Sequence, residues 1–277
     1  MDKDTDAPRK DNPKEQSPGL LKRLLRYVAI TVAVLLLLAG GSYGYAYATT
    51  PDHIKHPKFQ HYHFRTQIVV NGKVVDFSDD TFQKKYEAVN CNADIADLPI
   101  HFHDHVDQMT HIHWDGMTGG EFLKAFGWNF IGGNNSVLGY RFDLGAKPVA
   151  VKTYGKLLPA APDNAKYYVY VGDADEYTQK DWNDFLNKDF EAFFGKKSKL
   201  GQANTPGFSI ANWFFPRVSA HGGEDHGTSQ KSEEELSRIN NLLGNVVIFA
   251  QEKEPTKEQI NARFDALVPL SDSTCGG

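Results

Sequence analysis

Between Tyr27 and Pro51 the chain runs for 25 residues without one charged side chain. About 20 apolar residues are enough to cross the hydrocarbon core of a bilayer as a helix. Tyr43, Tyr45 and Tyr47 stand at the outer end of this run, where aromatic side chains favour the membrane interface. We therefore expect a transmembrane helix over residues 27–51, with the lipid bilayer as its partner.

The residues before this run predict its orientation. Residues 1–26 contain seven basic and five acidic side chains, and Lys22, Arg23 and Arg26 adjoin the apolar run. Because basic residues stay on the cytoplasmic side of a membrane, we expect a single-pass protein of the cell membrane with its main part extracytoplasmic. The first residues are rich in Asp, Lys and Pro, which predicts a disordered cytoplasmic tail over 1–26.

A second interpretation of the same segment is a cleaved signal peptide. Ala46-Tyr47-Ala48 matches the small-x-small pattern of a cleavage site, so the protein would be secreted after cleavage near Ala48. The long, partly acidic stretch before the apolar run favours the uncleaved anchor. Both interpretations place residues 52–277 outside the cytoplasm.

The composition of the chain excludes several classes of protein. A net charge of -5 and a pI near 6.1 argue against a nucleic-acid partner, which would require a basic face. Two cysteines are too few for a disulfide scaffold. Histidine is unevenly placed, since nine of the 11 lie between His53 and His113.

Strand and helix patterns alternate without a repeated unit after residue 51, which predicts an α+β fold. We expect a transmembrane helix followed by a mixed, largely antiparallel sheet with several flanking helices. Residues 52–155 would form a His-rich β domain, and 156–277 an α+β region that either continues this domain or forms another. Strands are expected at 61–70, 137–143, 149–154, 166–171 and 246–250, and Asn71-Gly72 predicts a hairpin.

Helix signals are clear at four places. Thr118-x-x-Glu121 and Thr256-x-x-Gln259 are capping boxes. The apolar spacing from Trp182 to Phe194 predicts one helix that Thr178 caps and Gly195 ends. Another helix is expected from Ser232 to Gly244, with Leu242 and Leu243 facing inward.

The histidines form clusters with one shared spacing, His-x-His. Side chains at i and i+2 of a strand point to the same face, so each cluster presents neighbouring imidazoles. Neutral imidazole binds Zn, Cu, Ni and Fe well. We therefore predict a transition-metal site, with a Zn or Cu ion as the cofactor. The candidate ligands are His61, His63, His101, His103, His105, His111, His113 and Cys91.

The second and third clusters permit a test of register. If residues 101–113 form a hairpin with an odd loop centred on Gln108, His105 faces His111 and His103 faces His113. All five imidazoles then share a face, whereas an even loop places the two clusters on opposite faces.

Three roles remain open for Cys91, which precedes His101 by ten residues. Its thiolate would favour Cu(I) or Zn. Alternatively it pairs with Cys275 outside the cytoplasm, or it is an ordinary buried cysteine.

The block LPIHFHDHVDQMTHIHW, preceded by HYHFRTQIVVNGKVV and Cys91, resembles an uncharacterised group of extracytoplasmic, often membrane-anchored proteins. They share His-x-His, Asn-Gly-Lys, Pro-x-His-x-His-Asp and Ile-His motifs. The resemblance covers about residues 59–130. It implies one coherent unit, and no activity is established for the group.

A shorter resemblance involves the third cluster. His111-Ile112-His113-Trp114-Asp115-Gly116 is similar to the zinc strand of α-class carbonic anhydrases, which reads His-x-His-Trp-Gly. The resemblance implies that His111 and His113 are zinc ligands. It covers six residues, Asp115 interrupts Trp-Gly, and the strand of the third ligand is missing.

Three functions fit these patterns. The first is a membrane-tethered extracytoplasmic protein that captures, buffers or transfers Zn or Cu. The second is a metal-dependent enzyme of the hydratase or hydrolase type, which uses a metal-bound water. The third is a surface interaction module in which the metal is structural or absent. The chain contains no GxSxG, HExxH or GxGxxG motif, so we favour the first, and the sequence names no protein partner.

Overall fold

The computed structural model describes residues 19–83, 99–102, 108–142, 147–198 and 232–270. The chain divides into two compact units, Met1–Thr49 and Thr50–Gly277.

The first unit contains helix α1, Leu20–Thr49. Its 30 residues span roughly 45 Å at 1.5 Å per residue, which exceeds the hydrocarbon thickness of a bilayer. With a mean hydropathy of 2.1 over its most apolar window, α1 is a candidate membrane span. It begins seven residues before the predicted start, because LLKRLLR consists of good helix formers. It ends at Thr49, and Pro51 precedes the short helix α2, Asp52–Lys55.

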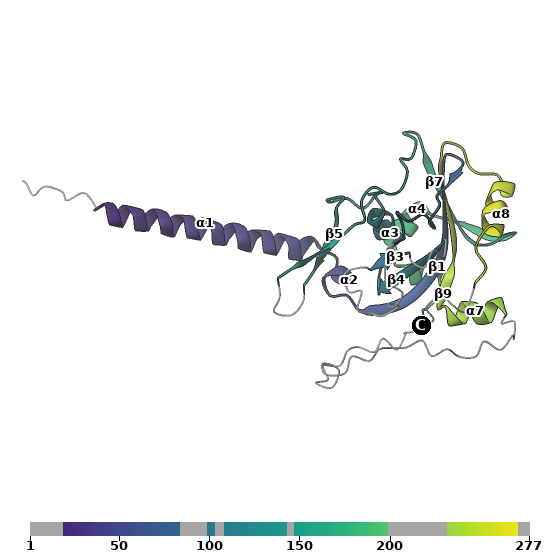
Figure 1. The fold of residues 1–277 in the computed structure, drawn as a ribbon, viewed down its shortest axis with the longest axis horizontal. Helices are drawn as coiled ribbons and strands as arrows, with labels where there is room; N and C mark the ends of the chain where they lie inside the picture. Colours follow the sequence, from purple (N-terminus) through teal and green to yellow (C-terminus); the bar gives the residue numbers. More distant parts are fainter. Residues whose placement is uncertain (1–18, 84–98, 103–107, 143–146, 199–231, 271–277) are drawn as a thin grey trace, which may run out of the picture. The chain divides into compact units, whose positions relative to one another are not determined.

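The second unit is built on a sheet whose described strands lie in the order β3-β4-β1-β9-β7-β8, with β2 beside β1 (Figure 1). Among these strands β1 and β9 run parallel, and the other neighbouring pairs are antiparallel. The strands are β1 Phe59–Val70, β2 Lys73–Val74, β3 Ile100–His101, β4 Met109–Trp114, β7 Lys166–Asp173, β8 Glu176–Lys180 and β9 Leu242–Gln251. The predicted α+β class with a mixed, largely antiparallel sheet is confirmed.

The hairpin predicted at Asn71-Gly72 is present, and two further predicted strands pair as a second hairpin. Asn71 and Gly72 both have positive φ, 49° and 79°, as a two-residue type I′ turn between β1 and β2 requires. The second hairpin joins β5, Val137–Arg141, to β6, Val149–Lys152, and forms a sheet of its own.

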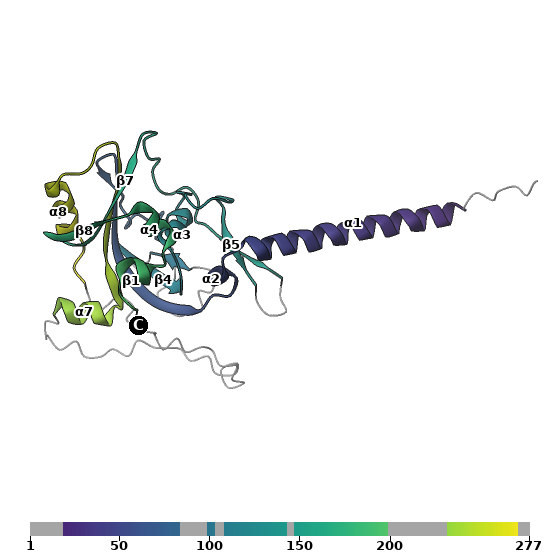
Figure 2. The same ribbon diagram turned by 180° about the vertical axis from the view of Figure 1, so that it is seen from behind.

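Helices cover both faces of the large sheet (Figures 1 and 2). On one face the main core packs against α3 Gly119–Ala125, α4 Trp182–Asn187 and α5 Phe190–Phe194. On the other, α8 Lys257–Asp265 covers Val247 and Phe249, and α7 Glu233–Ile239 lies beside the start of β9. The capping boxes at Thr118 and Thr256 are confirmed.

The single helix expected to start at Thr178 is wrong. Strand β8 continues to Lys180, and two short helices follow it. Asp181 caps α4 through the backbone N–H of Asp184, and Asp189 caps α5 in the same way. The cap at Asp189 starts a new helix within the apolar series from Trp182 to Phe194, which the sequence pattern assigns to one continuous helix.

The expected helix from Ser232 to Gly244 is also too long. It ends at Ile239, and Leu242 already belongs to β9. Asn241 takes a left-handed conformation, with φ 45°, which Asn tolerates better than other non-glycine residues. This turn brings Asn240 and Asn241 against the first His-x-His cluster.

Candidate metal centre

Because side chains alternate along a strand, the histidines of β1 and β4 lie on the face of the sheet that points away from the main core. In β1, Tyr62 and Phe64 pack in the core, while His61 and His63 point to the other face. In β4, Ile112 and Trp114 face the core, while His111 and His113 face away from it. The apolar residue between each pair of histidines therefore fixes the direction of both imidazoles.

The strand registers bring these clusters together. His63 lies directly opposite His111 in the antiparallel β1–β4 pair, and His101 lies opposite His111 in the β3–β4 pair. The sequence left two alternatives open, and for the described histidines the structure has the one in which the clusters share a face. The register differs from a hairpin centred on Gln108, since His101 and not His105 lies opposite His111.

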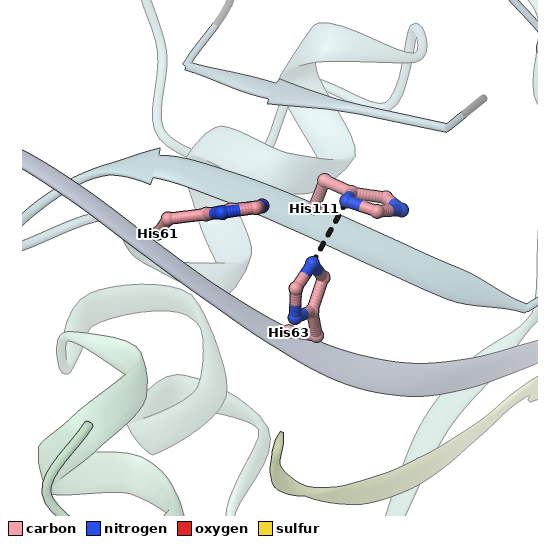
Figure 3. Close-up of side chains that lie close together, drawn as sticks. All are labelled: His61, His63 and His111. Carbon is pink, nitrogen blue, oxygen red and sulfur yellow. Dashed lines mark hydrogen bonds between the residues drawn. The ribbon is translucent and has the colours of Figure 1, made fainter. Parts of the chain in front are cut away.

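Three of these imidazoles have the geometry of a metal group (Figure 3). One ring nitrogen from each of His61, His63 and His111 lies within 4.8 Å of the other two. His63 and His111 are buried, whereas His61 is half-buried. The group therefore has two buried histidines and one half-buried histidine, whose Nε2 is itself shielded from solvent.

The bonds of His63 define its protonation. Its Nδ1 contacts the carbonyl oxygen of Asn240, and its Nε2 lies 2.9 Å from Nδ1 of His111. Because a carbonyl can only accept, the neutral ring of His63 carries its proton on Nδ1 and has a lone pair on Nε2. His111 then donates from Nδ1 to that lone pair. A backbone carbonyl that holds Nδ1–H in this way is typical of ligating histidines in metal sites.

The remaining distances suit a metal after a small adjustment. Zinc–nitrogen bonds of about 2.0–2.1 Å place two tetrahedral ligand atoms about 3.4 Å apart. The nitrogens of His63 and His111 are 2.9 Å apart, so an ion between them must separate the rings slightly and displace the shared proton. This displacement is the ordinary exchange of a proton for a metal on imidazole.

His101 and His113 extend the array beyond this triad. The ring of His113 stacks on those of His61 and His101 with centroids 4.9 and 4.8 Å apart, and His101 stacks on His111 at 5.4 Å. Both are buried. Their rings lie beside the triad, but neither belongs to the group of three whose ring nitrogens converge.

The eight predicted ligands thus have three outcomes. His61, His63 and His111 form the candidate group, and His101 and His113 lie beside it. The structural positions of His103, His105 and Cys91 lie outside the described residues. Sequence reasoning missed the carbonyl of Asn240, because the expected helix ran through this position.

A separate histidine also has a defined role. Nε2 of His53 lies 2.7 Å from Oε1 of Glu121, whose other oxygen accepts from the backbone N–H of Thr118. Burial by itself lowers the pKa of His53, but the hydrogen bond and charge of Glu121, with Asp115 and Asp189 nearby, raise this pKa above its ordinary value. The carboxyl group that the sequence explains as part of a capping box therefore also forms an ion pair.

Comparison of the chain with protein-family models, with curated proteins and with solved structures gave no match.

Proposed function

We propose that this protein is a membrane-tethered, extracytoplasmic transition-metal-binding protein that captures, buffers or transfers Zn or Cu. Helix α1 would be the tether, and the imidazoles of β1 and β4 would be the ligands. One observation carries the metal: ring nitrogens of His61, His63 and His111 converge within 4.8 Å. Three neutral nitrogen donors suit Zn and Cu better than Mg or Ca, which prefer oxygen.

The surroundings of the triad support ligand exchange. The carbonyl of Asn240 holds His63 in the tautomer that leaves Nε2 free to bind a metal. His111 is buried, so the surrounding residues restrict the position of its imidazole. His61 is half-buried and provides a route for an ion from solvent. His101 and His113 stack beside the triad, so a movement of either ring would bring another nitrogen donor to the ion. Transfer of an ion from ligand to ligand requires such neighbouring donors.

An enzyme is the second candidate, and the number of ligands favours it. Three protein ligands leave a fourth tetrahedral position for water, as catalytic zinc sites do. The two hypotheses differ in what fills this position after loading. X-ray absorption of the zinc-loaded protein would show three nitrogens and an exchangeable oxygen for an enzyme, and four nitrogens if His101 or His113 joins the ion.

Metal content is the primary test. The full chain, purified in detergent without a His tag, is dialysed against trace Zn²⁺ or Cu²⁺, and bound metal is counted by mass spectrometry. We expect one ion per chain at the triad. His63→Ala and His111→Ala should each weaken metal binding at least about tenfold, because each leaves only two of the three convergent donors and a third must come from a displaced neighbouring ring.

His56→Ala is the matched control, because His56 is exposed and lies outside the described His face. It should retain the full amount of metal. Circular dichroism of each variant separates a lost ligand from a lost fold. Binding that is unchanged in both His63→Ala and His111→Ala, with the fold intact, would contradict the proposal.

A further inference from the structure

A second set of polar side chains lies further along the same face of β1. Arg65 follows His63 by two residues, and its side chain is only 6% exposed. Nε of Arg65 donates to Oδ1 of Asn245 at 2.7 Å, and Nη1 donates to the carbonyl of Val268 at 3.0 Å. A buried guanidinium normally requires a full set of acceptors, so this position is a specialised one.

Asn245 connects Arg65 to a carboxylate on the next strand. Its Nδ2 donates to Oδ1 of Asp173 at 2.6 Å and to the carbonyl of Gly172 at 3.1 Å. Three adjacent strands, β1, β9 and β7, thus present a cation, an amide and an anion in a row. The side-chain amide of Asn245 bridges the guanidinium of Arg65 and the carboxylate of Asp173, so it holds the two charged groups close together.

These groups line a hollow of about 480 Å³ that is open to solvent, with Arg65 buried and Asp173 exposed. Arg65 and Asp173 line one part of it, and Leu236, Phe264 and Leu267 line another. Such a volume suits a small organic molecule. The lining therefore combines a charged pair with an apolar surface.

Glu233 partly closes the cationic end. Its Oε1 lies 3.2 Å from Nη2 of Arg65, but its side chain is 74% exposed. An ion pair with so exposed a partner contributes little, and the carboxylate can turn into solvent. With Glu233 turned into solvent, the charges of Arg65 and Asp173 cancel in the lining. Asp173 would then repel a ligand that carries only a negative charge, and Arg65 would repel one that carries only a positive charge.

From these contacts we propose that the cavity binds a zwitterion, a free α-amino acid with an apolar side chain. Its carboxylate replaces that of Glu233 on Arg65, its ammonium group faces Asp173, and its side chain lies against Leu236 and Phe264. The span from ammonium to carboxylate in an α-amino acid is similar to that of the Asn245 amide that bridges the two protein groups. This site is independent of the metal proposed above.

Calorimetric titration of the full chain in detergent with L-leucine tests this site, and EDTA in the buffer removes any contribution of metal. We expect saturable binding of leucine. N-acetyl-L-leucine lacks the ammonium group and L-leucinamide lacks the carboxylate, so each should bind at least about tenfold more weakly. Asp173→Asn should reduce the preference for leucine over N-acetyl-L-leucine.

Glu233→Gln removes the competing carboxylate, so it should bind leucine more tightly than the wild type. Glu234→Gln is the matched control, since Glu234 is exposed and does not line this cavity. Both variants leave the buried groups intact, so a folding defect does not confuse the result. Absence of saturable leucine binding in both the wild type and Glu233→Gln would overturn the proposal. Equal affinity for leucine and N-acetyl-L-leucine would overturn it as well.

Discussion

His63 uses its two ring nitrogens for different contacts, one to the turn after α7 and one to the neighbouring strand β4. Nδ1 is held by the carbonyl of Asn240, and Nε2 faces His111. The backbone of His63 also donates to the carbonyl of Asn241 at 3.2 Å. One residue therefore ties β1 to the segment that leads into β9, and an ion bound at Nε2 would add a link between β1 and β4 through His111.

This connection predicts that metal stabilises the folded chain. A ligand at about 100 times its dissociation constant adds about 2.7 kcal/mol to the free energy of unfolding. We expect Zn²⁺ to raise the melting temperature of the wild type, EDTA to reverse the rise, and His63→Gln to show neither effect. Differential scanning fluorimetry measures all three. His56→Gln should respond as the wild type does, and an equal response of His63→Gln would argue against binding at this residue.

His53 provides the second prediction, which concerns pH. Its folded pKa is raised above about 6.5 by Glu121, so the folded state binds more protons than the unfolded state in the window just above that value. The contribution of the pair is complete below pH 6.5 and is lost as the pH rises through the folded pKa. Stability that His53 adds should therefore fall as the pH rises above about 6.5.

Urea denaturation of the wild type and His53→Gln at several pH values measures this contribution. The difference between the two should be about 1–3 kcal/mol at pH 6, since a hydrogen bond to a charged group is lost, and should shrink towards pH 8. His56→Gln, at an exposed neighbouring histidine, should show no such trend. A difference that grows with pH would mean that the neutral form of His53 makes the favourable contact.

At the scale of elements, the sequence predicts local features well and pairings less well. The His-x-His spacing correctly predicts which face of a strand carries the imidazoles, because alternation is a local property. The parallel pairing of β1 with β9 joins His63 to Leu242 across most of the chain, and no local pattern contains it. The pairing of His101 with His111 differs by four residues from a hairpin centred on Gln108, and the sequence could not choose it because VDQM contains no turn signal.

The end of α7 shows why the site itself was only partly predictable. Leu236, Ile239, Leu242 and Leu243 have helical spacing, so the pattern continues through Asn240 and Asn241. In the structure the last two leucines have different partners, since Leu243 joins the main core and Leu242 packs near Met109. The Asn-Asn pair is the turn signal, and it places a carbonyl on His63.

The start of α3 carries a prediction at this scale. A Cβ added to Gly119 would lie 2.4 Å from the backbone oxygen of Phe185 and 2.6 Å from its ring. Helical Gly→Ala changes usually stabilise, but here the close contact with α4 reverses the sign. We expect Gly119→Ala to lower the free energy of unfolding by about 1–3 kcal/mol, as overpacking does.

Chemical denaturation of the full chain measures this effect. Gly44→Ala is the control, because Gly44 is also helical and has no other atom within 4 Å of an added Cβ. It should leave the second unit unchanged. An increase in stability for Gly119→Ala would mean that α3 and α4 separate more easily than their contacts indicate.

At the scale of the whole chain, the two units have opposite requirements. Residues from Thr50 onward bury an apolar core beneath a sheet with charged helices on its surface, whereas α1 exposes Leu35, Leu36 and Leu37 along its length. Such an exposed apolar surface is that of a candidate membrane span. The proposed metal site belongs entirely to the second unit, so its chemistry does not depend on whether α1 is retained or cleaved.

The tether gives the final prediction. Lys22, Arg23 and Arg26 lie within the first two turns of α1, and the helix continues to Thr49 through Ala46-Tyr47-Ala48. A basic start predicts a cytoplasmic N-terminus, and an uncleaved helix predicts that the full 31.0 kDa chain stays in the membrane after an alkaline carbonate wash. Protease added outside intact cells should digest the second unit and spare an N-terminal tag.

Intact mass measurement of the purified protein then separates the two fates of α1. Cleavage near Ala48 would yield a soluble product that begins close to Tyr47 or Thr49 and would overturn the anchor while leaving the metal proposal intact. Replacing Ala46 and Ala48 by Leu is the matched control, because it removes the small-x-small pattern and preserves the helix. If the wild type is already uncleaved, this variant should have the same location and differ in mass only by the two substitutions.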